Sequence, residues 1–229
     1  MTGEILNLIA QSEGSDRFYG VTIGIVTSNE DKEGLGRVKV KFPQISDKDE
    51  SYWARVLTPM AGKERGIYFL PEPLDEVLVA FDQGDINFPY ILGSLWNGED
   101  KPPAKNEDGK NNKRLIKSRS GHQIILDDTQ DAEKIIIRDS TGKNEIAIDS
   151  KNNAMTLKVE KDLTIEAKGK ISLKTSGGDL EIECQNFKIQ AEQNCEIKAK
   201  ANCNLEATAG IGIKCLAGVK INDGALEVT

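Results

Sequence analysis

The chain has 229 residues, a length that suits one large or two small domains, and its 37 acidic against 30 basic residues give a net charge of −7. Its single histidine excludes, within one copy, a multi-histidine zinc site. The sequence holds no run of 18 apolar residues, and residues 1–10 lack the basic start of a signal peptide, so neither a membrane span nor a secretory leader is expected.

Residues 1–17 form a short segment ahead of the first expected domain. Four apolar side chains gather in this segment, and they are Ile5, Leu6, Leu8 and Ile9. A segment of this kind is either a loose terminus or a peptide that docks onto a partner, and the sequence leaves both alternatives open.

Residues 18–97 consist of short stretches with strand-forming residues, separated by Gly and Pro turn signals. Strands are expected at 19–27, 36–42, 52–58, 66–70, 76–81 and 90–95. Five or six strands of this length within about 80 residues predict a small closed Greek-key barrel of the OB type.

OB barrels often bind nucleic acid, but the charge of this part of the chain opposes that function. Residues 1–112 carry 19 acids and 12 bases, whereas nucleic-acid binding requires a basic face with stacking aromatic side chains. Lys39, Lys41 and Arg55 alternate along the expected strands, which is typical of a solvated face. We therefore expect no nucleic-acid partner, and a bare OB-type binding module with a stabilising tail is a weaker alternative.

A repeat of eight residues runs from Phe187 to Asp223 and extends upstream with interruptions. It lies within residues 113–229, which follow an expected linker at 98–112 and carry 18 acids and 18 bases. Within each repeat the apolar residues lie two apart, as at Phe187, Ile189 and Ala191. Alternation at period two is typical of a strand with one buried face, and a fixed longer period is typical of stacked units. Each repeat is predicted to be a five-residue strand followed by a three-residue corner. Irregular strands around the apolar triplets at 124–126, 135–137 and 146–148 are expected at the start of this region.

The length of the repeat predicts an intertwined homotrimer. A single chain that winds a three-sided β-helix needs three strands per turn, roughly 18 to 25 residues. An eight-residue step instead fits a triangular prism in which three chains each supply one side of every layer, and so bury an apolar stripe that one chain would expose. The residues expected in the trimer core are Leu163, Ile165, Ile171, Leu173, Phe187, Ile189, Cys195, Ile197, Cys203, Leu205, Ile211, Ile213, Val219 and Ile221.

The cysteines and the histidine do not indicate a cofactor. The four cysteines are Cys184, Cys195, Cys203 and Cys215. All of them fall on inward columns of the repeat and none has metal-ligand spacing, so we expect free thiols that pack as small hydrophobic residues, and no cofactor. His122 is expected in a solvent-facing turn; an ion held by three copies on the trimer axis is the alternative.

Six stretches of the front part carry a resemblance to a known family. They are, in chain order, Gly24–Thr27, Gly34–Val40, Ser51–Val56, Phe69–Glu72, Asp75–Phe81 and Pro89–Leu95. Together they resemble the OB domain of the VgrG family, the spike proteins of type VI secretion systems and contractile injection particles. Ser118–His122, followed by Asp127 and Asp128, resembles the place where that family begins its β-helix.

The resemblance implies an all-β protein, with an OB-fold barrel followed by an intertwined trimeric triple-stranded β-helix that acts as the spike of a baseplate. It implies assembly in the bacterial cytoplasm as part of a contractile particle, and a location outside the cell or in the target envelope after firing. The expected function is puncture of that envelope, with only transient membrane contact. The family has several hundred residues of hub domain before the OB domain, so a separate hub protein is expected to contact the N-terminal segment.

The same resemblance implies a tip protein of the PAAR type at the far end of the spike. The residues expected to dock it are Ile221, Asn222, Asp223, Gly224, Ala225, Leu226, Glu227, Val228 and Thr229. The alternative function is a trimeric tailspike that binds or cleaves glycans. Cleavage requires paired carboxylates, and the pairs Asp75 with Glu76 and Asp82 with Asp85 stand beside turn residues where acids are ordinary. The expected protein is therefore not an enzyme.

Overall fold

The structure is a computed structural model that describes residues 17–44 and 46–218. The chain divides into two compact units, Met1–Thr164 and Ile165–Thr229. Every strand of the described residues lies in the first unit, and these residues contain no helix. The described part accordingly has no helix of the length and hydropathy that crossing a bilayer requires.

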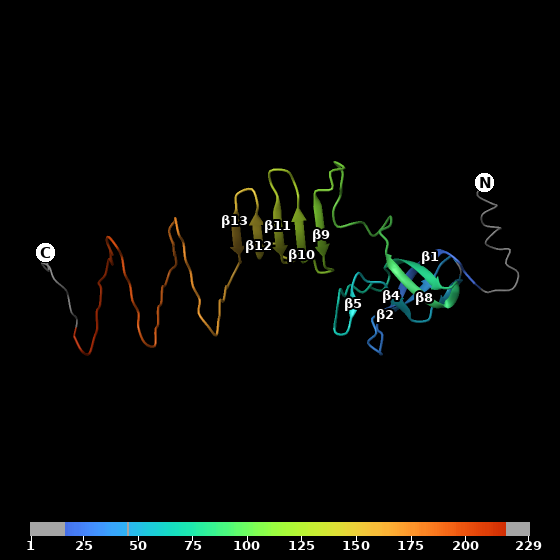
Figure 1. Cartoon of the computed structure of the whole chain (residues 1–229), viewed down its shortest axis with the longest axis horizontal. Helices are drawn as coiled ribbons and strands as arrows, with labels where there is room; N and C mark the ends of the chain where they lie inside the picture. Colours follow the sequence, from blue (N-terminus) through green and yellow to red (C-terminus); the bar gives the residue numbers. More distant parts are fainter. Residues whose placement is uncertain (1–16, 45, 219–229) are drawn as a thin grey trace. The chain divides into compact units, whose positions relative to one another are not determined.

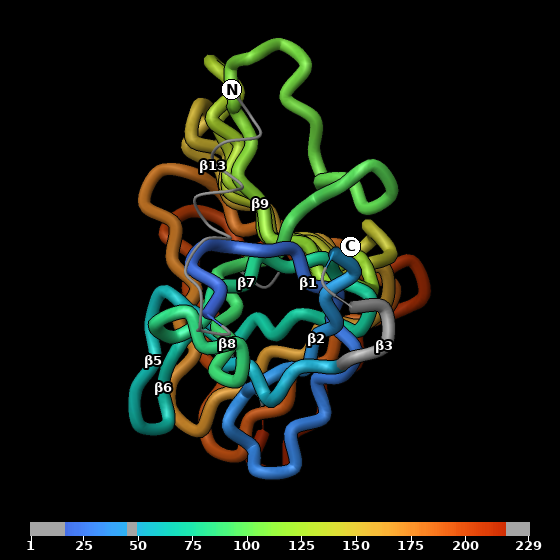
Figure 2. The backbone as a smooth tube through the Cα atoms, turned by 90° about the vertical axis from the view of Figure 1, so that its right-hand side faces the viewer, coloured from blue at the N-terminus to red at the C-terminus, as the bar shows by residue number. Residues whose placement is uncertain are grey.

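Five strands of the first unit close into a barrel (Figures 1 and 2). The barrel strands are β1 (Val21–Ser28), β2 (Arg37–Phe42), β4 (Ala54–Val56), β7 (Glu76–Asp82) and β8 (Asp85–Ser94). Their order around the barrel is β1-β7-β8-β4-β2, and β2 pairs back onto β1. The pairing of β4 with β8 is parallel, and the other pairings in the barrel are antiparallel. The predicted OB-type barrel is confirmed.

The barrel core follows from alternation along these strands. Every second side chain of β1, β2 and β7 is buried, which is the period of two that a strand with one inward face requires. The buried apolar side chains are Val26, Val38, Val40, Ala54, Val77, Val79, Phe81 and Ile91. Phe18 and Phe42 pack edge-on against Phe81, with ring centroids 5.6 and 5.5 Å apart. Gly24 lies inside, where an added Cβ would stand 3.1 Å from a Val79 methyl group.

Two segments of the barrel region differ from the sequence-based expectation. Strand β3 (Ser46–Glu50), which was not expected, pairs with β2 as an edge extension. The strand expected at 66–70 is wrong beyond its first residue, because only Arg65–Gly66 (β6) pairs, with Ala61–Gly62 (β5), in a short hairpin. Residues 67–70 instead form a loop anchored by a hydrogen bond from the Ile67 N–H to the Met60 carbonyl oxygen, 3.0 Å.

A second sheet follows the barrel in the same unit. It is an antiparallel meander of β9 (Lys113–Lys117), β10 (Gln123–Asp127), β11 (Lys134–Arg138), β12 (Glu145–Asp149) and β13 (Ala154–Lys158), in sequence order (Figure 1). Each expected apolar triplet lies in one of these strands. The strands are regular five-residue units with unbroken register, so the expectation of irregular strands was wrong. Turns of Gly, Asn, Asp and Ser between equal strands account for this regularity.

The remaining described residues, 159–218, carry the eight-residue repeat and have no strand within one chain. They run as an extended zigzag, drawn from yellow to red in Figure 1. An extended backbone without ladder partners leaves its N–H and C=O groups free for pairing with other chains.

Candidate functional site

The meander β9–β13 has one apolar face. Its cross-strand partners form two rows that run perpendicular to the strands. One row consists of Ile116, Ile124, Ile137, Ile146 and Leu157, and the other of Arg114, Leu126, Ile135, Ile148 and Met155. Nine of these ten side chains are apolar. We call these ten residues the apolar face.

Within one chain the apolar face has no cover. Eight of its nine apolar side chains are exposed, from 40% for Ile148 to 70% for Met155. Contiguous apolar patches of this kind on soluble proteins mark interaction surfaces. At one end of the face, side chains that include Ile116, Ile124 and Leu157 line a hollow of about 570 Å³. The face is therefore the strongest candidate for an interface in the described part of the chain.

The opposite face of the meander carries ion pairs near the strand ends, around a central row of Leu115, Ile125, Ile136 and Ala147. Lys113 pairs with Asp127 at 3.9 Å, Lys134 with Asp149 at 3.5 Å, and Arg138 with Glu145 at 2.6 Å. A hydrogen bond from the Thr129 hydroxyl, assisted by Lys113 and Lys134, lowers the pKa of Asp127. Cross-strand pairs of opposite charge are favourable on a solvated sheet face.

Arg114 is the one charged member of the apolar face, and the sequence analysis did not single it out. It lies in β9, the first strand of the meander, directly opposite Leu126. Its guanidinium forms an ion pair with Asp128, just beyond the end of β10. A long side chain can cover apolar surface with its methylene groups while its charge remains in water, which suits Arg114 at the edge of the face.

His122 lies in the turn between β9 and β10 and is exposed, as predicted. Its Nδ1 accepts a hydrogen bond from the Ser140 backbone N–H at 3.1 Å, so the side chain ties two turns together. In the second of these turns, hydrogen bonds from the Thr141 hydroxyl and the Asn144 amide lower the pKa of Asp139 to about 2. Among the described residues no group of three or more His, Cys, Asp or Glu side chains is placed to hold a metal ion.

The predicted trimer-core residues that the structure describes are exposed to solvent in one chain. Those from Leu163 to Ile213 are all exposed; Leu205, for example, is 73% exposed. The four cysteines are free and exposed as well. In the sequence, the apolar positions of the meander continue into the repeat. Met155 and Leu157 of the apolar face are followed, eight residues later, by Leu163 and Ile165. The columns inferred from the sequence are thus continuous with the apolar face.

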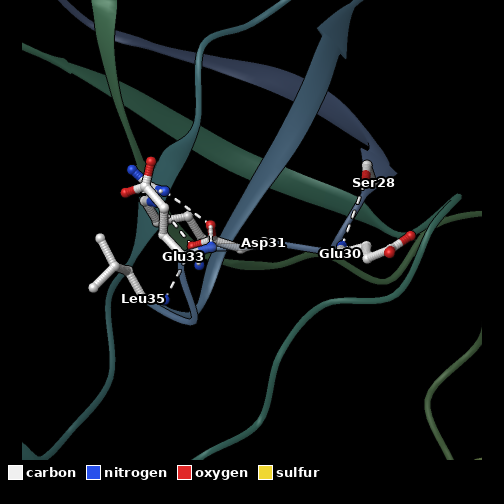
Figure 3. A network of polar contacts seen from close by, with 6 residues as sticks. Ser28, Glu30, Asp31, Glu33 and Leu35 are labelled. Carbon is white, nitrogen blue, oxygen red and sulfur yellow. Dashed lines mark hydrogen bonds and ion pairs between the residues drawn. The ribbon is translucent and has the colours of Figure 1, made fainter.

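In the barrel, the β1–β2 loop is held by one carboxylate (Figure 3). Asp31 accepts hydrogen bonds from the backbone N–H groups of Glu33, Leu35 and Arg37, and from two nitrogens of the Arg37 guanidinium. The Arg37 bonds are the main reason why the pKa of Asp31 lies well below its ordinary value. Near this loop, the Arg37 guanidinium and the Lys39 ammonium lie 5.7 and 5.4 Å from the Trp53 ring centroid.

One acid of each candidate pair, Asp75 and Asp85, holds a turn. Asp75 accepts a hydrogen bond from the Glu72 N–H at 2.8 Å, and Asp85 accepts from the backbone N–H and the side-chain amide of Asn87 at 2.9 and 2.8 Å. Asp82 lies opposite Asp85 in the β7–β8 hairpin. The hydrogen bonds of Asp75 and Asp85 explain these two carboxylates as parts of turns.

Two predicted contact regions fall outside the described residues. These are the hub-contact side chains Ile5, Leu6, Leu8 and Ile9, and the tip-docking residues from Ile221 to Thr229. Val219 and Ile221 of the predicted trimer core lie outside the described residues too.

Comparisons with known proteins agree with the barrel. Residues 22–96 match the family described as the type VI secretion system/phage-baseplate injector OB domain. The chain is 32% identical over 114 residues to the type VI secretion system spike protein VgrG1b of Pseudomonas aeruginosa, a match that covers 44% of this chain and 15% of VgrG1b. It is 28% identical over 114 residues to the spike protein VgrG3 of Vibrio cholerae, covering 46% of this chain and 11% of that protein.

A third relative has a different name. The actin cross-linking toxin VgrG1 of Vibrio cholerae is 35% identical over 72 residues, which cover 30% of this chain and 7% of the toxin. The chain spans between 7 and 15% of the length of these three relatives. Residues 22–96 thus match the injector OB-domain family, and this part of the chain is similar to VgrG spike proteins, as its sequence motifs predicted.

Proposed function

We propose that three copies of this chain form the central spike of a contractile injection machine, of the type VI secretion or phage-baseplate kind. The OB domain occupies residues 18–97, a linker follows at 98–112, and residues 113–229 form the shaft. The apolar face of β9–β13 is the observation that carries the proposal. A charged face with its ion pairs closed and an apolar face with no cover are what one side of a three-sided prism presents.

Three copies also provide what the second unit lacks. Each extended segment between residues 159 and 218 has free backbone groups and an exposed apolar column, and an intertwined prism pairs the former and buries the latter. A closed prism has no lateral sheet edge, so it resists edge-to-edge aggregation. Since no chain can leave without unwinding from the other two, the shaft should be kinetically stable.

The mechanism is mechanical. Contraction of a surrounding sheath drives a narrow, threaded shaft through the target envelope, and the charged outward face keeps the shaft soluble before and after firing. The particle assembles in the cytoplasm, and the spike acts outside the cell or in the target envelope. In this proposal the protein is not an enzyme, since Asp75 and Asp85, one acid of each candidate pair, hold turns.

Two partners complete the proposal. A separate hub protein contacts the N-terminal segment, because four apolar side chains, Ile5, Leu6, Leu8 and Ile9, precede the first expected strand in the sequence. A tip protein of the PAAR type docks on Ile221–Thr229 by adding a strand or loop to this segment. The relatives are named spike proteins, which supports this arrangement by analogy only.

The native mass of the purified protein tests the proposal. Multi-angle light scattering is expected to give three copies of the 25.1 kDa chain, also in mild denaturant. A folded monomer would contradict it. A trimer that releases reducing sugars from surface glycans would favour the tailspike alternative.

A further inference from the structure

One turn of the barrel projects a leucine into solvent from a backbone conformation that leucine rarely adopts. Leu74 has φ of 82°, and it is 79% exposed. A branched side chain at positive φ costs free energy that glycine would avoid, and such outliers cluster at functional sites. Nothing within the described chain covers the Leu74 side chain enough to compensate for that cost.

The turn that carries Leu74 is rigid and acidic. The Leu74 N–H donates to the Val26 carbonyl oxygen at 2.8 Å, and the Asp75 N–H donates to the Glu72 carbonyl oxygen at 3.0 Å. Asn29 holds the same turn through a 3.1 Å hydrogen bond to the Pro71 carbonyl oxygen. Leu74 thus stands as a fixed apolar knob beside the carboxylate of Asp75, while Glu72 on its other side is paired with Arg119 at 2.8 Å.

A groove of complementary character lies elsewhere on the same barrel. Leu35, Tyr52, Arg55, Asn87 and Phe88 are among the side chains that line its volume of about 920 Å³. Leu35, Tyr52 and Phe88 are each at least 60% exposed. The Arg55 guanidinium lies 5.7 Å from the Tyr90 ring centroid, so its position is fixed by an aromatic neighbour. The groove is apolar and cationic, whereas the knob is apolar and acidic.

We propose that in the trimer the Leu74 turn of each barrel docks into this groove on the barrel of the next copy. The inference rests on the proposed trimer and adds a specific contact to it. A knob and a groove on different parts of one domain make a heterologous interface, and such interfaces close into a ring under three-fold symmetry. Burying Leu74 among Tyr52 and Phe88 offsets the backbone cost, and Arg55 then faces Asp75.

Two features favour a second copy as the occupant. A trimeric shaft tethers three barrels at high effective concentration, so a small contact suffices. Residues 1–112 carry a net charge of −7 in each copy, and gathering three such domains is unfavourable unless cationic and acidic surfaces face each other. A contact between the Arg55 groove and the acidic knob provides that arrangement.

Disulfide trapping in the full-length protein tests the contact. The double variant Leu74→Cys/Tyr52→Cys is oxidised in air with copper phenanthroline and analysed on non-reducing gels, with peptide mapping of the linked positions. We expect a covalent trimer in which the two substituted positions are linked between chains. The single variant Leu74→Cys is expected to give no such species, nor is Leu74→Cys/Glu99→Cys, which places the second thiol in the exposed linker.

The outcomes separate this inference from the proposed function. Light scattering first establishes whether each variant is trimeric. A trimer without the link between positions 74 and 52, or with that link only within one chain, overturns the knob contact and leaves the spike intact. If the unsubstituted protein is monomeric, both the knob contact and the proposed spike function are overturned. Equal trapping in the Leu74→Cys/Glu99→Cys control would also overturn the contact, because it would show that linkage needs no specific docking.

Discussion

Asp31 and Arg37 form a two-pronged ion pair that closes the β1–β2 loop of the barrel. The Arg37 Nε donates to one carboxylate oxygen of Asp31 and a terminal nitrogen donates to the other, both at 2.8 Å. The Asp31 side chain is 3% exposed, so the pair is shielded from water. Charge-assisted pairs with this fork geometry are stronger and more directional than single contacts. The loop is therefore a fixed part of the barrel.

Replacing Asp31 with Asn is expected to lower the thermal midpoint of the barrel at pH 7. The amide keeps the shape of the side chain but removes the charge that Arg37 faces. The folded-state pKa of Asp31 lies below its unfolded value near 3.8, so its contribution is fully present above that value and is lost as pH falls through the folded-state pKa. Melting curves at pH 7, 4 and 2 should show the difference between wild type and variant shrinking in acid.

Glu33→Gln is the matched control for this prediction. Glu33 also contacts Arg37, at 3.0 Å, but its side chain is 70% exposed, so its pair is screened by water. We expect little change in the midpoint at any pH. Equal effects of the two substitutions would show that the Asp31 carboxylate is not the anchor of the loop.

The sequence predicted the fold where local pattern and tertiary structure agree. Alternating residues such as Val77 and Val79 identified β7, and Gly and Pro identified the turns around it. The prediction of a strand at 66–70 was wrong because the aromatic residues Tyr68 and Phe69 raise the strand propensity of the segment, while their side chains remain in solvent. Propensity in strands depends on packing against neighbours, which the sequence does not specify.

The candidate site was only partly predictable for a related reason. The period of eight predicts inward columns around Leu205, since repetition carries information beyond any single residue. The meander has strands of five residues with turns of unequal length, so its apolar rows appear only once the register pairs Ile124 with Ile137. The Leu74 knob could not be predicted, because a positive φ at a leucine has no signature in sequence.

Truncating Ile91 in the barrel core tests whether the barrel and the shaft unfold independently. Ile91 is fully buried, and Ile91→Ala is expected to destabilise the barrel by about 2–5 kcal/mol through lost burial and a residual cavity. The trimer should persist, because its proposed core lies in other residues. Urea titration followed by Trp fluorescence, with light scattering on the same samples, measures both properties. If the trimer dissociated at the urea concentration at which the barrel unfolds, the barrel and the shaft would not unfold independently.

Introducing a charge on an inward column is expected to prevent assembly. Leu205→Asp would place three carboxylates in one layer of the prism, each costing on the order of several kcal/mol unless it becomes protonated. Glu206→Lys, one residue later on the outward side, should be nearly silent. Size-exclusion chromatography with light scattering measures the outcome. If both variants assembled equally well, the inward and outward assignment would be wrong.

The four cysteines report burial in the trimer directly. Cys184, Cys195, Cys203 and Cys215 are exposed in one chain, yet all are expected on inward columns of the prism. A thiol reagent such as DTNB should therefore react slowly with the native protein, and with four thiols per chain after denaturation. Rapid reaction of all four in the native trimer would show that these columns face solvent.

Removal of the last eight residues tests the proposed docking end. Deleting Asn222–Thr229 removes most of the segment that would present the final layer, while leaving the inward columns up to Ile213 in place. We expect the truncated protein to remain trimeric by light scattering and to lose co-purification with a PAAR-type tip protein expressed beside it. A matched control, Glu227→Gln, changes one charge in this segment and should retain the tip. Retention of the tip by the truncated trimer would show that docking lies elsewhere on the shaft.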